Sequence, residues 1–130
     1  MKYDYYKAVR YDVYNYIKDN IDYYKENYDD LLEAEDKLND ELWAEDSVTG
    51  NGSGSYTFNS AVAKDYLEDN FDLGIEAYSD FGYDKSKFYE DFVENPEKAD
   101  VTIRCYCLPT AIYNICSEYE LEDFENDLEM

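Results

Sequence analysis

Histidine is absent from this chain of 130 residues, and basic residues are few: 11 Lys and Arg stand against 33 Asp and Glu. Without His, the chain lacks the usual acid–base group at neutral pH, the usual base of a catalytic triad and the commonest zinc ligand. The formal net charge is −22. Because nucleic acids and anionic membranes select basic surfaces, we expect neither of them as a direct partner.

Proline and glycine are also scarce, with two and five residues, which argues against long flexible segments. The apolar stretch Cys105–Cys116 is too short to span a membrane, and we expect no signal peptide in Met1–Tyr5. The three Cys are an odd number without the spacing of a disulfide framework. These absences predict an intracellular, cytoplasmic protein with reduced thiols.

Aromatic residues, in contrast, are abundant: they make up 18% of the chain, with 17 Tyr and 6 Phe. Hydrophobic residues reach 45%. Acidic disordered chains are poor in aromatic residues, so this composition predicts a folded core in spite of the charge. The length is that of one domain, and we expect residues 1–130 to form a single acidic helical domain.

In the first half of the sequence, apolar residues recur at helical spacing over residues 4–21 and again over 27–43. A Gly-rich segment over 46–55 then predicts a loop. Tyr56–Phe58 could form a short extended segment. The predicted fold class is therefore mostly α: a compact bundle of five or six short helices with a Gly-rich loop and at most a minimal β element.

In the second half, a helix over 101–119 is preferred to a strand over 101–107. Its apolar stripe extends over 19 residues, whereas the strand alternation covers only seven. Pro109 should kink this helix. The tail 118–130 is predicted to be either a short terminal helix or a frayed acidic end. Residues typical of helix ends mark the remaining helices: Asn59 or Ser60, Gly82, Asp84 and Asn95.

The net charge is the strongest functional signal, because it exceeds what solubility requires. Duplex DNA carries one charge per about 1.7 Å of its axis, so 22 charges correspond to roughly 37 Å of duplex. A compact chain of this length is roughly 36 Å across. The protein could thus carry about the charge of the duplex that it would cover, as a DNA mimic does. A merely solubilising surface is the alternative.

Nine of the 17 Tyr lie in the first 28 residues, more than one buried stripe can hold. Tyr is enriched at interfaces and stacks on Arg, although about half of the cluster could instead line the edge of the core. The predicted partner-binding residues come from the second helix, the first helix and the 45–58 loop. They are Asp29, Asp30, Glu33, Asp36, Asp40, Glu45, Asp46, Tyr5, Tyr11, Tyr16 and Tyr56.

No motif indicates catalysis, a cofactor or a metal site. The segment Gly50-Asn-Gly52-Ser-Gly54 lacks the Lys and Ser/Thr of a P-loop, and the acids do not follow the EF-hand pattern, which leaves only adventitious calcium binding open. On a helix, Cys105 and Cys107 would point about 200° apart and could not share a zinc ion. Carboxylate pairs are too common among 33 acids to indicate a glycosidase. We therefore predict a protein that is not an enzyme, with no catalytic, cofactor-binding or metal-binding residues.

Two blocks of the sequence are Trp43-x-x-Asp46-Ser-Val-Thr-Gly50-Asn-Gly-Ser-Gly54-Ser-Tyr56-Thr-Phe58 and Ala99-Asp100-Val-Thr-Ile103-Arg104-Cys105-Tyr106. They resemble blocks of small acidic proteins of bacteriophages and mobile elements of gut Firmicutes, and with their spacing they cover residues 40–115. The resemblance implies a mobile-element setting and no particular activity. By its charge, the chain also resembles DNA-mimic anti-restriction and anti-CRISPR proteins.

We therefore predict an inhibitor of a host nucleic-acid-binding defence enzyme, a CRISPR nuclease or a restriction enzyme, acting in the cytoplasm of the bacterial cell. The partner would be a basic nucleic-acid-binding protein, and a homodimer is left open. One alternative is a non-inhibitory scaffold protein of the mobile element that binds a basic partner or self-associates through Tyr. Another is a small acidic chaperone-like binder of a basic protein.

Overall fold

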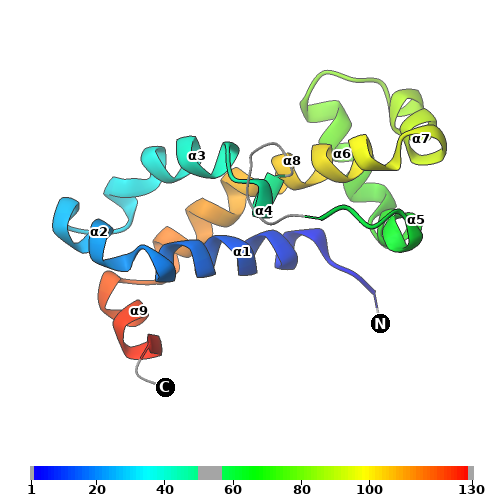
Figure 1. The fold of residues 1–130 in the computed structure, drawn as a ribbon. Coiled ribbons are helices and arrows are strands. Elements are labelled where there is room, and N and C mark those ends of the chain that lie inside the picture. The colour runs from blue at the N-terminus through cyan, green and yellow to red at the C-terminus, as the bar shows by residue number, and fades with distance from the viewer. Residues whose placement is uncertain (1, 50–56, 129–130) are drawn as a thin grey trace.

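The computed structural model describes residues 2–49 and 57–128. The mostly α prediction is confirmed, since the described residues form helices joined by short turns and contain no strand. In chain order (Figure 1) the elements are α1 (Tyr5–Asp19), α2 (Ile21–Asn27), the 3₁₀ helix η1 (Leu32–Ala34), α3 (Glu35–Trp43), α4 (Asp46–Thr49), α5 (Ser60–Asp69), α6 (Phe71–Asp80), α7 (Lys85–Glu94), α8 (Pro96–Glu118) and α9 (Leu121–Leu128).

Helix α8 runs through the middle of the structure and packs against α1, α3, α5, α6 and α7 (Figure 1). Pro96 occupies its first turn, where a missing N–H costs no hydrogen bond. The preference for a helix over 101–119 is therefore confirmed, and the helix begins earlier than predicted. Eleven of its residues are buried, so neighbouring helices cover most of its sides.

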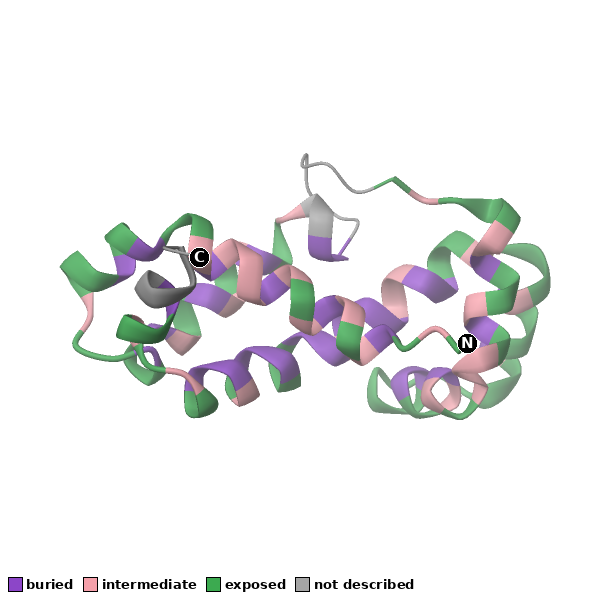
Figure 2. Cartoon of the chain, turned by 90° about the horizontal axis from the view of Figure 1, so that it is seen from below, coloured by how far each residue is buried: buried purple, intermediate pink, exposed green. Residues whose placement is uncertain are grey.

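The apolar stripe predicted for the first helix is confirmed, because Val9, Val13 and Ile17 are fully buried on α1. On α3, Leu38 and Leu42 are fully buried as well. Figure 2 shows the buried parts of the helices in purple, mainly on sides that face other helices. The carboxylates are thereby directed mainly to the outer sides of α2 and α3.

The helix predicted over 27–43 is wrong in its first part. Helix α2 ends at Asn27, and Tyr28 has extended backbone angles. A new helical segment then begins because the Asp30 carboxylate accepts a hydrogen bond from the Glu33 N–H at 2.9 Å. A local side-chain cap of this kind competes with continuation of the preceding helix. With α2 and α4 as further short helices, the described part of the chain has more helices than the five or six predicted.

The loop predicted over 46–55 begins too early, since Asp46–Thr49 forms α4. The Thr49 hydroxyl donates to the Glu45 carbonyl at 3.2 Å, and Val48 is fully buried. Residues 50–56, which include most of the Gly-rich segment and Tyr56, lie outside the described residues. Thr57 and Phe58 are described and form no strand, so the extended segment at 56–58 stays a prediction.

The predicted helix ends in the second half are confirmed. The Asn59 side chain caps α5 by accepting from the Ala61 N–H, and the Asp84 side chain caps α7 by accepting from the Ser86 N–H. Gly82, after α6, has a φ of +86°, which favours glycine. The tail forms α9, held to the core by the fully buried Phe124.

Helices α6 and α7 approach each other closely at Gly74. The ring of Phe88 lies on this glycine: an added Cβ would stand 2.4 Å from Phe88 Cζ. The rings of Phe71 and Tyr78 also surround Phe88, with centroids 5.2 and 5.3 Å away. Gly74 therefore provides the space that this aromatic cluster needs.

We expect Gly74→Ala to lower the free energy of unfolding by about 1–2 kcal/mol. Overpacking costs about 1–3 kcal/mol, and the approach of 2.4 Å places this substitution in the upper part of that range, at about 2–3 kcal/mol. The better helix propensity of Ala offsets about 1 kcal/mol of this cost. Urea denaturation measures the change. Ser79→Ala, at an exposed position of the same helix, should leave stability unchanged or slightly raised. A Gly74→Ala variant as stable as the wild type would contradict the tight contact with Phe88.

Candidate partner-binding surface

The five acids predicted to face a partner from the second helix are all exposed, but they come from three elements. Asp29 and Asp30 lie in the turn after α2, and Glu33 lies in η1. Asp36 and Asp40 occupy successive turns of α3. The structure therefore presents these carboxylates along a bent path instead of along one straight helix.

Hydrogen bonds to the backbone fix two of these carboxylates. Glu33 accepts from the Asp29 N–H at 2.9 Å, and Asp30 accepts from the Glu33 N–H at the same distance. A carboxylate at the start of a helix also interacts favourably with the helix dipole. Asp30 and Glu33 thus stabilise the turn while their charge remains exposed to solvent.

Glu41 ties α3 to α1 and α2. Its Oε2 accepts from the Tyr24 hydroxyl at 3.0 Å and from the Tyr16 hydroxyl. Burial, together with the Glu41 carboxylate, raises the pKa of both Tyr hydroxyls above the usual range. Lys37 Nζ lies 3.6 Å from the other Glu41 oxygen. The contacts of Glu41 with Tyr16, Tyr24 and Lys37 thus position the exposed acids of α3 relative to α1.

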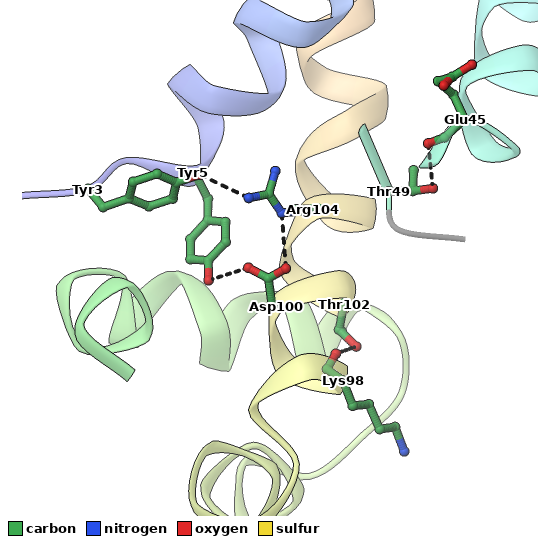
Figure 3. Close-up of polar contacts among 8 residues, drawn as sticks. All are labelled: Tyr3, Tyr5, Glu45, Thr49, Lys98, Asp100, Thr102 and Arg104. Atoms are coloured by element: carbon green, nitrogen blue, oxygen red, sulfur yellow. Dashed lines mark hydrogen bonds and ion pairs between the residues drawn. The ribbon is translucent and has the colours of Figure 1, made fainter. Parts of the chain in front are cut away.

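The prediction that Tyr16 contacts a partner therefore needs correction, because this half-buried hydroxyl is already bonded to Glu41. The prediction for Tyr5 is wrong. Tyr5 is fully buried, and its hydroxyl donates to Asp100 Oδ1 at 2.8 Å (Figure 3). Amphipathic spacing pointed to this outcome, since Tyr5 lies one turn before the buried Val9.

The remaining predicted residues differ in exposure. Tyr11 is 69% exposed and available for contact. Glu45 is partly buried, and its backbone carbonyl accepts a hydrogen bond from the Thr49 hydroxyl (Figure 3). Asp46 begins α4, but its side chain lies outside the described part of the chain, as does all of Tyr56.

Helix α9 adds acids that the sequence interpretation left undecided. Glu120 and Glu122 line a surface hollow of about 520 Å³ together with Asp29, Asp30 and Lys25. The helix is placed there because the ring of Phe124 packs 4.7 Å from that of Tyr14 on α1. The spacing of Leu121 and Phe124 was the available signal for this packing.

We use the name acidic surface for the exposed carboxylates of α2, the following turn, η1 and α3, together with Glu120 and Glu122 at the start of α9. Two lysines, Lys25 and Lys37, lie among these elements within the described residues. The acidic surface comprises Asp22, Glu26, Asp29, Asp30, Glu33, Asp36, Asp40, Glu120 and Glu122.

A polar cluster joins Tyr3 and α1 to α8 (Figure 3). The Asp100 carboxylate accepts from Tyr5 and from Arg104 Nε at 3.2 Å, and Arg104 also donates to the Tyr3 hydroxyl at 3.1 Å. A hollow of about 240 Å³ adjoins the cluster and is lined by Tyr66 and Phe58 among others. With its charges paired internally, the cluster is suited to fixing the fold.

The described residues 2–49 and 57–128 contain no group of three acidic or cysteine side chains arranged to hold a metal ion. Cys105, Cys107 and Cys116 are buried and form no disulfide among the described residues. Burial raises the pKa of Cys107 and Cys116 to about 12, which disfavours the reactive thiolate. Among the described helices, none is both long and apolar enough to cross a membrane.

Some carboxylates lie inside the structure and are unavailable to a partner. Asp91 is fully buried and accepts from the Tyr78 hydroxyl at 2.7 Å. Asp12 is partly buried on α1. Burial raises the pKa of Asp12 to about 6, while the Arg104 guanidinium opposes this shift. A charged Asp12 is therefore a cost to the folded state at neutral pH.

We expect Asp12→Asn to raise the free energy of unfolding by about 1 kcal/mol near pH 7.5. The folded pKa lies above the unfolded one near 4, so the wild type loses stability as the pH rises from about 4 to 6. A pKa shift of this size in a fully buried group would correspond to about 3 kcal/mol of stability. The partial solvent exposure of Asp12 reduces this energy.

Urea unfolding near pH 7.5 and pH 4.5 checks this expectation. The stability that Asp12→Asn gains over the wild type should be about a third as large at the lower pH as at the higher one. Asp65→Asn, at an exposed position of α5, removes the same charge and serves as the control. An equal gain at both pH values, or in both variants, would contradict a burial cost at Asp12.

The structure thus brings Asp29 and Asp30 of the turn together with Glu120 and Glu122 beside α9. It removes the buried Tyr5 from the predicted contact set and engages the Tyr16 hydroxyl with Glu41. Tyr11 stays exposed on another helix, α1. Comparisons of this chain with protein-family models, with curated proteins and with solved structures found no match.

Proposed function

We propose that this protein is an inhibitor from a bacteriophage or mobile element that occupies the basic nucleic-acid channel of a host defence enzyme. The observation that carries the proposal is the acidic surface, which presents nine exposed carboxylates from α2, the turn, η1, α3 and α9 with only two lysines among these elements of the described chain. In this interpretation the carboxylates take the place of nucleic-acid phosphates, and the protein acts in the host cytoplasm.

Local electrostatics support this assignment. Of the two lysines, Lys37 is directed to Glu41 at 3.6 Å and leaves Asp36 and Asp40 exposed. A dense surface of one sign steers an oppositely charged partner and raises its association rate by 10- to 1,000-fold. Such binding weakens steeply with salt. A channel lined by Lys and Arg is the partner that fits this chemistry, and a CRISPR nuclease or a restriction enzyme has one.

The geometry also supports a fixed surface. Glu41 holds α3 against α1 and α2, and the caps formed by Asp30 and Glu33 fix the turn. A preorganised surface pays less conformational entropy on binding than a flexible acidic tail does.

The test compares two triple charge reversals with equal change in net charge. Asp29→Lys/Asp36→Lys/Asp40→Lys alters the acidic surface, and Asp65→Lys/Glu68→Lys/Glu76→Lys alters exposed acids of α5 and α6. Glu33 is spared because it stabilises the turn. We expect the first variant to inhibit the target about 100-fold less strongly and the second to inhibit nearly as well as the wild type.

The target is first identified by capture from a host lysate at about 50 mM and about 300 mM salt, with mass spectrometry of the eluate. Recovery of a nuclease or restriction subunit that added DNA displaces supports the proposal. Recovery of structural proteins of the mobile element alone would favour the scaffold function. Equal loss of inhibition in both triple variants would show that net charge, and not the acidic surface, is responsible.

A further inference from the structure

Bases outnumber acids at the start of this chain, although they are outnumbered three to one in the chain as a whole. The first 18 residues contain four bases and two acids, whereas the other 112 contain seven bases and 31 acids. Both acids of the first segment are engaged in the fold: Asp4 caps α1 by accepting from the Lys7 N–H at 3.1 Å, and Asp12 is partly buried. Helix α1 itself has three bases against Asp12 and the exposed Asp19, and it is the one helix of the described residues with a positive net charge.

Aromatic side chains accompany these bases. A surface hollow of about 270 Å³ is lined by Lys7, Arg10, Tyr11, Tyr14 and Tyr119, none of which carries a carboxylate. Arg10 is ion-paired with Glu118 and lies 5.9 Å over the ring of Tyr119. We use the name cationic–aromatic face for these five lining residues. Lysine, arginine and exposed tyrosine together suit a carboxylate-rich partner surface.

We propose that the cationic–aromatic face binds the acidic surface of a second copy of this chain. The two surfaces have opposite charge, and within one chain they adjoin at Tyr119 of the face and Glu120 of the acidic surface. Tyr16 reaches Glu41 of α3, but Lys7 lies about 14 Å further along α1. The face of one chain is therefore separated from its own α3 carboxylates.

This contact is heterologous, because the cationic–aromatic face of one copy meets a different surface of the next. Each copy that joins leaves one free surface of each kind, so association continues beyond a dimer unless a ring closes. An isologous dimer through Tyr would instead stop at two copies.

The expected dependence on salt follows because the attraction and the repulsion between two copies act over different distances. The attraction acts across the contact itself, whereas the repulsion between two molecules of net charge −22 acts over their whole volume. The Debye length is about 30 Å at 0.01 M salt, about 10 Å at 0.1 M and about 3 Å at 1 M. Association should therefore be strongest near 0.1 M, weaker at 0.01 M because of repulsion, and weaker at 1 M because the contact is screened.

Sedimentation velocity of the purified protein, over a hundredfold range of concentration and at these three salt concentrations, tests the proposal. We expect Lys7→Glu/Tyr11→Ser to weaken association at least about tenfold. Lys64→Glu/Tyr113→Ser makes the same change of charge and removes one exposed Tyr elsewhere, on α5 and α8, and should associate as the wild type does.

Mixing two variants gives a sharper test. Asp36→Asn/Asp40→Asn impairs the acidic surface but keeps the cationic–aromatic face, and Lys7→Glu/Tyr11→Ser does the opposite. Each variant alone should be monomeric, and an equimolar mixture should form a 1:1 complex that grows no further. This outcome requires both variants to be folded, so a folding defect cannot imitate it.

A wild type that stays monomeric near 0.1 M salt would overturn the proposal. Equal association of the two charge-matched variants would overturn it too, as would a mixture that forms no complex. These measurements use the purified protein alone. Their outcome is therefore independent of whether the protein inhibits a defence enzyme.

Discussion

Repulsion among 33 carboxylates, with only 11 bases to offset it, is the constraint on which the arrangement of this structure depends. Compactness requires a core element that adds almost no charge of its own. Helix α8 meets this requirement, because its segment from Cys105 to Ser117 has no charged residue. The acidic helices surround it, so their carboxylates lie on outer sides, where water and salt screen them.

Tyrosine compensates for the shortage of bases in the interior. Tyr5, Tyr24 and Tyr78 are fully buried, and each donates its hydroxyl to a carboxylate. The acceptors are Asp100, Glu41 and Asp91. A hydrogen bond to a charged acceptor contributes about 1.5–3 kcal/mol, and tyrosine supplies it together with a large apolar area. Part of the high tyrosine content is thus a structural consequence of the acidity.

Helical periodicity was sufficient to predict α1, α5, α6 and α7, because apolar spacing and local caps such as Asn59 and Asp84 act within a few residues. The break after Asn27 was not predictable in this way. It depends on reciprocal hydrogen bonds between side chains and backbone around Glu33, and the apolar stripe continues across it.

The candidate surface was predictable in composition but not in extent. Sequence spacing identified the acids of α3, yet it could not show that α9 returns to the turn after α2, since that depends on long-range packing of Phe124 on Tyr14. Burial of Tyr5 likewise depends on a partner 95 residues away, Asp100. Tertiary contacts decide whether a tyrosine is exposed, so the sequence alone does not predict it. The charge of each residue, in contrast, follows directly from the sequence.

The two proposed contacts use the same carboxylates, and this makes them competitive. A copy whose acidic surface is covered by α1 of its neighbour cannot present it to a basic channel, so the affinity for the target falls as self-association increases. The competition is unequal, because the cationic–aromatic face offers two bases, Lys7 and Arg10, and Arg10 is already paired with Glu118. A channel lined by many Lys and Arg would therefore displace the cationic–aromatic face of the neighbouring copy from the acidic surface. The chains released from the assembly would then be the inhibitory species.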